Sequence, residues 1–152
     1  MNELDGSYPV RLPVWWGRRG AAGPHPELEG VTGRFIVIRH PKRFRRFEGL
    51  LARMFGAPNE LRRPLDDLNS LLWELCDGTR SFEEICELMD STFHERIAPV
   101  NERTTAAITR FNQLGLIGLS KAPFDGEWKR GPGHDPSGEL LPPDEKLMLD
   151  WS

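Results

Sequence analysis

Apolar residues near the start of the chain follow a period of two, which is typical of a strand with one buried face. Along YPVRLPVWW the residues of one parity are Tyr8, Val10, Leu12, Val14 and Trp16. A loop rich in glycine and proline follows, and RFIVIRHP then predicts a second strand from Arg34 to Pro41, where proline ends it. The short segment Asn59–Pro64 predicts a third strand.

Between the second and third strands the pattern changes to that of a helix. From about residue 43 to residue 55, apolar residues fall on one helical stripe and basic residues lie opposite them. The sequence therefore predicts a basic amphipathic helix, inserted between two strands and closed by Gly56 and Pro58.

Three further helices are predicted after the third strand. The first spans about 66–76 and is ended by Gly78, which can adopt the left-handed conformation. The second begins at a capping box formed by Ser81 and Glu84. The third spans about 99–114, and the short extended piece LIGLS follows it. Together the elements predict an α+β fold, a winged helix-turn-helix with a small three-stranded antiparallel sheet packed on three helices.

Prolines indicate which edge of this sheet is closed. The N–H groups of alternate strand residues point to opposite edges, so Pro9 and Pro13 remove two donors from the same edge of the first strand. We therefore expect the strand over 8–16 to lie at the border of the sheet, paired on one side only, with the strand over 34–41. The third strand, 59–63, has no internal proline, so its outer edge is predicted to be open to a partner strand.

Residues 7–120 are predicted to form one domain that carries the basic helix as an insertion. Residues 121–152 are rich in proline, glycine and acids and are predicted to be a mostly irregular tail, with Leu147, Leu149 and Trp151 docking at its end. The two cysteines, Cys76 and Cys86, fall on apolar helix faces, which favours buried reduced thiols in a cytoplasmic protein. No apolar run approaches the ~20 residues of a membrane span, and no secretory signal is recognisable.

The net charge of −3 hides a strong segregation of charge along the chain. Residues 34–63 carry nine Arg or Lys against two acids, a net of +7, whereas residues 64–95 carry nine acids against Arg80, a net of −8. Such blocks are typical of two solvated faces, and the alternative is an anionic partner bound at the basic face.

No catalytic or metal-binding pattern is recognisable in the sequence. The four histidines lie far apart, and none has a recognised ligand spacing. The paired acids at 66–67 and 83–84 sit at helix starts, where the helix dipole accounts for them. We find no glycine-rich phosphate loop, GxSxG or HExxH. The sequence therefore predicts a protein that is not an enzyme and that needs no metal or cofactor.

Two stretches carry a family resemblance: SLLWELCDGTRSFEEICELM, from Ser70 to Met89, and RTTAAITRFNQLGLIGL, from Arg103 to Leu119. An apolar helix ending in W-x-L-C-D-G-T-R, a capped helix opening on an E-I pair, and a third helix ending in Q-L-G-L-I resemble the PqqD family. Its members are small chaperone-like proteins of pyrroloquinoline quinone biosynthesis. The chain departs from a minimal PqqD by its basic helix and its 32-residue tail, which disfavours a quinone precursor as the substrate.

The resemblance implies a peptide-recognition module without catalysis of its own. Such proteins hold the leader of a ribosomally made precursor peptide and present the precursor to a modifying enzyme, often a radical SAM enzyme. The leader binds as an added strand on the third strand, over a groove floored by the third helix. Carried onto this chain, the implied peptide-binding residues are Asn59, Glu60, Leu61, Arg62, Arg63, Arg103, Ala106 and Arg110.

Two other functions are compatible with the sequence. In a DNA-binding winged helix, the helix over 99–114 would enter the groove and present Thr105, Thr109, Asn112 and Gln113 to base edges. That helix carries only Arg103 and Arg110 as cations, which disfavours binding to phosphates. The second alternative is a membrane-surface or enzyme-docking role for the basic helix, Phe44 to Phe55.

Overall fold

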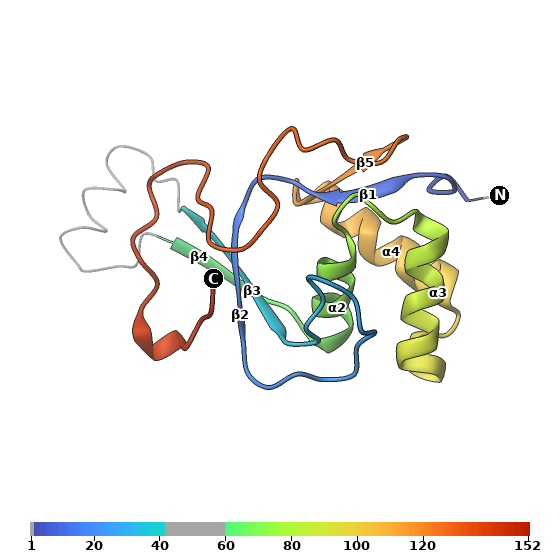
Figure 1. Ribbon diagram of the computed structural model, residues 1–152, viewed down its shortest axis with the longest axis horizontal. Helices are drawn as coiled ribbons and strands as arrows, with labels where there is room; N and C mark the ends of the chain where they lie inside the picture. Colours follow the sequence, from blue (N-terminus) through green and yellow to red (C-terminus); the bar gives the residue numbers. More distant parts are fainter. Residues whose placement is uncertain (1, 42–59) are drawn as a thin grey trace.

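The computed structural model describes residues 2–41 and 60–152; the predicted basic helix and Asn59 lie outside these residues. The described part is a mixed α+β structure with three α-helices, a three-stranded antiparallel sheet and a two-stranded sheet (Figure 1). The predicted α+β class and the three helices after residue 64 are thus confirmed.

The three-stranded sheet has the order β2-β3-β4, with β2 at Trp15–Arg19, β3 at Phe35–Pro41 and β4 at Glu60–Pro64. Both neighbouring pairs are antiparallel: Gly17 lies opposite Val37, and Arg39 lies opposite Arg62. The strands predicted over 34–41 and 59–64 are therefore confirmed for their described residues, and β4 forms one border of this sheet.

The single strand predicted over 8–16 is wrong. The chain forms two strands in two sheets: β1, Tyr8–Arg11, pairs with β5, Ile117–Ser120, whereas β2 pairs with β3. Pro13 lies in the short connection between them, where its missing N–H breaks no ladder.

The predicted pairing of this first segment on one side only is also wrong. β1 contacts β5 on one side and the segment after α2 on the other, where Gly78 N–H donates to Pro9 O at 3.0 Å and Arg11 N–H donates to Cys76 O at 2.9 Å. Pro9 is tolerated because its position needs only the carbonyl as an acceptor.

The helices begin and end at the predicted signals. Helix α2, Asp67–Leu75, is capped by Asp66, and α3, Phe82–Phe93, begins at a capping box in which Ser81 and Glu84 bond reciprocally. Helix α4 spans Val100–Gln113, and a short 3-10 helix, η1, His94–Ile97, precedes it. Gly78, in the turn that follows α2, has a φ of +83°, the left-handed conformation that was predicted for it.

The apolar stripes of these helices meet the β-strands in one core. The side chains that are almost completely buried there include Trp16, Ile36, Ile38, Leu71, Leu72, Trp73, Leu75, Phe82, Ile85, Met89 and Ile108. The two cysteines are free and buried, as predicted. Burial of this much apolar surface is the main source of the fold's stability.

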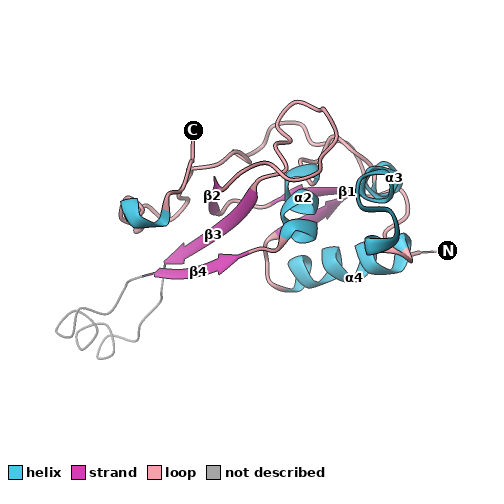
Figure 2. Ribbon diagram, turned by 90° about the horizontal axis from the view of Figure 1, so that it is seen from below, coloured by secondary structure: helices cyan, strands magenta, loops and turns pink. Residues whose placement is uncertain are grey.

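Two strands of the three-stranded sheet, β2 and β3, are covered on both faces. One face of β2 and β3 packs on the helices through residues such as Trp16 and Ile38, while Trp15 and Val37 point the other way into a second, smaller cluster with Leu149. Figures 1 and 2 show the last part of the chain lying across the sheet on the side away from α2. The predicted docking of the tail's end is therefore confirmed.

Candidate functional site

The outer edge of β4 is the first feature that could receive a partner. Leu65 N–H donates to Ile36 O at 2.9 Å, which places odd-numbered amides of this segment toward β3. Because N–H groups alternate along a strand, the amides of Glu60 and Arg62 point outward, and Pro64 offers an outward carbonyl without a donor. The edge thus presents two donors in extended backbone.

A buried charge network fixes the end of β4 that lies next to Pro41. Arg39, which is completely buried, holds Glu60 through two hydrogen bonds of 2.6 and 2.7 Å, and its guanidinium lies 4.4 Å from the centre of the Trp15 ring. The hydrogen bond from Arg39 is the main cause that lowers the pKa of Glu60. The carboxylate of Glu60 is therefore engaged inside the fold, and its contribution to a partner would be its backbone.

The other side chains of β4 are open to solvent. Leu61 is 54% exposed, and Arg63 is exposed on the same side of the strand, the side that Ile38 and His40 share on β3. Arg62 reaches back to Glu60 at 3.1 Å with a side chain that is 39% exposed. An incoming strand would therefore meet one aliphatic and two guanidinium groups here.

A pocket of about 130 Å³ lies just beyond the end of β4, between the first turn of α2 and α4. Its apolar lining includes Leu72, Met89 and Ile97, and its polar lining includes Asp66 and Arg103. Arg103 also donates to the carbonyl of Arg96. Of the α4 residues that the resemblance implies, Arg103 thus lies at this pocket, whereas Ala106 and Arg110 are exposed on α4 and do not line it.

The wall of the pocket is held by a salt bridge between η1 and α2. Arg96 Nη2 lies 2.8 Å from Asp67 Oδ2, and both side chains are partly exposed. Ile97, the next residue, is buried in the pocket's floor. The pair therefore positions the pocket's lining, although an exposed ion pair of this kind stabilises a fold only weakly.

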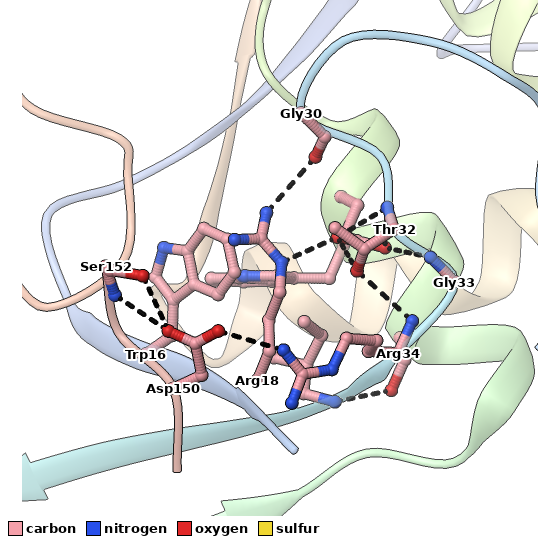
Figure 3. Close-up of polar contacts among 12 residues, drawn as sticks. Trp16, Arg18, Gly30, Thr32, Gly33, Arg34, Asp150 and Ser152 are labelled. Atoms are coloured by element: carbon pink, nitrogen blue, oxygen red, sulfur yellow. Dashed lines mark hydrogen bonds and ion pairs between the residues drawn. The ribbon is translucent and has the colours of Figure 1, made fainter. Parts of the chain in front are cut away.

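The outer edge of β2, at the other border of the sheet, is occupied. Arg18 and Asp150 exchange two backbone hydrogen bonds, of 2.7 and 2.6 Å, and Gly133 N–H donates to Trp16 O at 2.9 Å. Arg34 adds a 3.0 Å ion pair to the carboxylate of Asp150 (Figure 3). The prediction that prolines close this border of the sheet is wrong, because residues 133 and 150 cover it.

Sequence reasoning also missed a buried carboxylate beneath this edge. Glu74, on α2, is 1% exposed and accepts from Arg18 Nε at 2.8 Å, from the Thr32 hydroxyl at 2.8 Å, and from the backbone amides of Thr32 and Gly33 at 3.0–3.1 Å. All its lone pairs are used, so Glu74 ties β2 and the loop before β3 to α2. A single acid in an otherwise apolar helix stripe is the one sequence signal that could have indicated it.

The Arg11 side chain, which extends from β1, donates hydrogen bonds to carbonyl groups at the end of α2. Its Nη1 donates to the carbonyls of Trp73 and Glu74 at 2.8 and 2.9 Å, and its Nε donates to Arg130 O at 3.1 Å. Burial lowers its pKa to about 10, so the group stays charged at neutral pH. This contact links α2 to Arg130, in the segment after β5.

Within residues 2–41 and 60–152, no group of three His, Cys, Asp or Glu side chains is arranged as ligands for a metal ion. The part of the chain that the structure describes also contains no helix with the length and apolar character needed to cross a membrane. Comparisons with protein-family models, with curated proteins and with solved structures find no match to this chain.

Proposed function

We propose that this protein is a non-catalytic peptide-binding module of the PqqD type. It takes up the leader of a ribosomally made precursor peptide as an added strand on β4 and presents that precursor to a modifying enzyme, for which a radical SAM enzyme is the first candidate. In this proposal the three helices with the β1-β5 pair as a wing form a winged helix-turn-helix, and the working surface is the outer edge of β4.

The observation that carries the proposal is the difference between the two borders of the sheet. The edge of β2 is covered by the chain itself, whereas the outward amides of Glu60 and Arg62 have no backbone partner among the described residues. A strand added to such an edge gains affinity from main-chain hydrogen bonds and specificity from alternate side chains, so no catalytic group is required.

The side chains around β4 would determine which peptide sequences bind. Arg62, Arg63 and Arg103 favour acidic residues in the peptide, and Leu61 with the apolar lining of the pocket favours an aliphatic side chain. These groups lie on β4 and at the start of α4, which is the relationship between strand and helix that the resemblance implies.

A pair of variants at one position tests the proposal. Arg62→Pro removes an outward donor but leaves the ladder to β3 intact, whereas Arg62→Ala changes the same side chain and keeps the donor. We would select binding peptides from a displayed random library and measure their affinity for the two variants by fluorescence anisotropy. We expect Arg62→Pro to weaken binding by about tenfold or more, because a main-chain hydrogen bond is lost, and Arg62→Ala to weaken it much less.

Hydrogen exchange on the wild-type complex locates the bound peptide. The amides of Glu60 and Arg62 should become protected only when peptide is present, while those of Leu61 and Arg63 are already protected in the free protein. Selected peptides that protect another surface, or that bind both Arg62 variants equally, would refute strand addition at β4. Tight, salt-dependent binding to duplex DNA with no selected peptide would instead favour the DNA-binding alternative.

A further inference from the structure

Residues 147–151, the segment that covers β2, contact the sheet through their backbone and their side chains, as a bound peptide would. Residues 147–151 contribute Leu147 and Leu149 to the cluster around Trp15 and Val37, and the Trp151 ring lies 6.1 Å from the Trp15 ring, centre to centre. Between these apolar contacts, Asp150 pairs its backbone with Arg18 and its carboxylate with Arg34. The segment therefore makes the three kinds of contact of an added strand: backbone hydrogen bonds, apolar anchors and an ionic contact.

A glycine in β2 allows the backbone of the covering segment to lie close to the strand. Gly17 lies in the middle of β2, and a Cβ placed on it would come 3.1 Å from Asp150 O and 3.1 Å from the Trp15 ring. A glycine inside a strand often marks the close approach of another backbone. Its missing side chain leaves the space into which the carbonyl of Asp150 projects, so another backbone can approach β2 closely at this point.

The segment is held more lightly than the part of the chain that precedes it. Leu149 is its one buried residue, Met148 is 80% exposed, and its pairing with β2 is a single bridge at Asp150. Residues 124–133 are anchored separately, through the bond of Phe124 N–H to Gly78 O and through the contacts of Arg130 with β1 and β2. Phe124 and Arg130 therefore have anchors that do not involve residues 144–152.

We propose that the outer edge of β2, with the sheet face around Trp15, is a second peptide-binding site that residues 147–151 occupy in cis. Its ligand in trans is a segment of a partner polypeptide with an aliphatic residue, an acid and an aromatic residue in that order, the chemistry of Leu149, Asp150 and Trp151. The site is independent of the proposed function at β4, because it uses the opposite border of the sheet.

The two borders of the sheet would then differ in whether a segment of the same chain competes with a free peptide. A tethered segment competes with a free peptide at a high effective concentration, so the occupied edge is closed until a partner with the same chemistry outcompetes it or the segment is released. The open edge at β4 carries no such competitor among the described residues. One sheet could then hold a substrate strand and a partner strand at once.

The test uses the full chain with its segment weakened. The variant Leu149→Ser/Asp150→Pro removes the buried anchor, the carboxylate and one backbone donor but leaves the receiving surface unchanged, and Met148→Ser is the matched control because Met148 is exposed. The probe is a fluorescein-labelled synthetic peptide of residues 144–152, DEKLMLDWS, followed by anisotropy. We expect about tenfold or tighter binding to the double variant than to the wild type or Met148→Ser.

Hydrogen exchange at Arg18 N–H, which donates to Asp150 O, reports whether the site is occupied. It should be protected in the wild type, exposed in the double variant, and protected again with the peptide. A charge reversal then identifies the ionic contact: Arg34→Glu in the double-variant background should weaken binding of DEKLMLDWS, and the peptide DEKLMLKWS should restore it.

Four results would overturn the proposal. Protection of Arg18 that persists in the double variant would show that the segment is not displaceable, and failure of a released variant to bind the peptide would show that the edge is no site. Equal binding of a scrambled peptide would refute the ligand chemistry. A double variant that dimerises instead would show that the occupant is a second copy of this chain. None of these results depends on peptide binding at β4.

Discussion

Arg18 Nε lies 2.8 Å from Glu74 Oε2, and this ion pair joins β2 to α2 with side-chain exposures of 13% and 0%. Glu74 also holds the backbone of Thr32 and Gly33, while the backbone of Arg18 holds Asp150. Figure 3 shows the resulting arrangement, in which the loop before β3 and the last residues of the chain meet around Arg18. One buried carboxylate thus positions both the sheet and the edge that the chain's own segment covers.

The first prediction concerns this carboxylate. Glu74→Ala leaves Arg18 Nε, the Thr32 hydroxyl and two backbone amides without their acceptor, so we expect the free energy of unfolding to fall by about 3–5 kcal/mol. Glu74→Gln keeps the shape and one acceptor oxygen and should lose roughly 1–3 kcal/mol. Urea unfolding followed by tryptophan fluorescence measures both values. Glu87→Gln, at an exposed position of α3, is the control and should change stability by less than about 0.5 kcal/mol.

The second prediction separates backbone strain from steric clash at two glycines. Gly78 and Gly115 have φ angles of +83° and +73°, so alanine is strained at both, by roughly 1 kcal/mol. At Gly78 a Cβ would also lie 2.5 Å from Phe124 Cβ, whereas at Gly115 it would meet no atom within 4 Å. We expect Gly78→Ala to lower the unfolding free energy by about 1–3 kcal/mol more than Gly115→Ala. Equal losses for the two variants would show that Phe124 does not pack on Gly78.

The helices could be predicted because their signals are local. Ser81 and Glu84 form the capping box within one turn, and Gly78 and Gly115 end α2 and α4 through their own backbone angles. Such signals act over three or four residues and do not depend on the rest of the fold. The same holds for β4, whose predicted strand is a short segment bounded by Pro64.

The first strand was predicted wrongly because its pattern has two causes. Val10 and Trp16 share a parity, but they are buried in strands of different sheets, and Trp15 is buried as well. A period of two identifies one buried face only when the other face is solvated. Here residues 140–151 cover the second face, and the sequence places them more than 120 positions from Trp15. The Glu74 network escaped prediction for the same reason, since its partners, Arg18, Thr32 and Gly33, lie 41 to 56 residues away.

The third prediction concerns Arg63, which the proposed function places at the peptide-binding edge. Its side chain is exposed on β4, so Arg63→Ala should change the free energy of unfolding by less than about 0.5 kcal/mol. If acidic residues of the peptide lie beside it, the variant should weaken binding of library-selected peptides by a few-fold at low salt, and by less at high salt. A binding loss that is independent of salt would contradict an ionic role for Arg63. Arg19→Ala, in the border strand β2, is the control for charge at a distant site.

The last prediction follows from the buried thiols. Burial raises the pKa of Cys76 to about 12 and that of Cys86 to about 11, whereas in the unfolded chain both thiols ionise near their ordinary pKa. Since the folded-state pKa values are raised, the stability that the neutral thiols contribute is fully present below about pH 9 and is lost as the pH rises toward 11 and 12.

In that window the unfolded chain releases protons that the folded chain keeps bound. Each thiol should then lower the free energy of unfolding by about 1.4 kcal/mol per pH unit. Urea unfolding between pH 8 and pH 11, compared for the wild type and Cys76→Ala/Cys86→Ala, isolates this slope from that of lysine and tyrosine, which both proteins share. The double variant should be less stable at pH 8 because of the cavities that it creates, but its stability should fall less steeply with pH. Parallel pH profiles for the two proteins would show that both thiols ionise as readily in the folded chain as in the unfolded chain, in which case a thiol reagent should label both in the native wild type at pH 8 without unfolding.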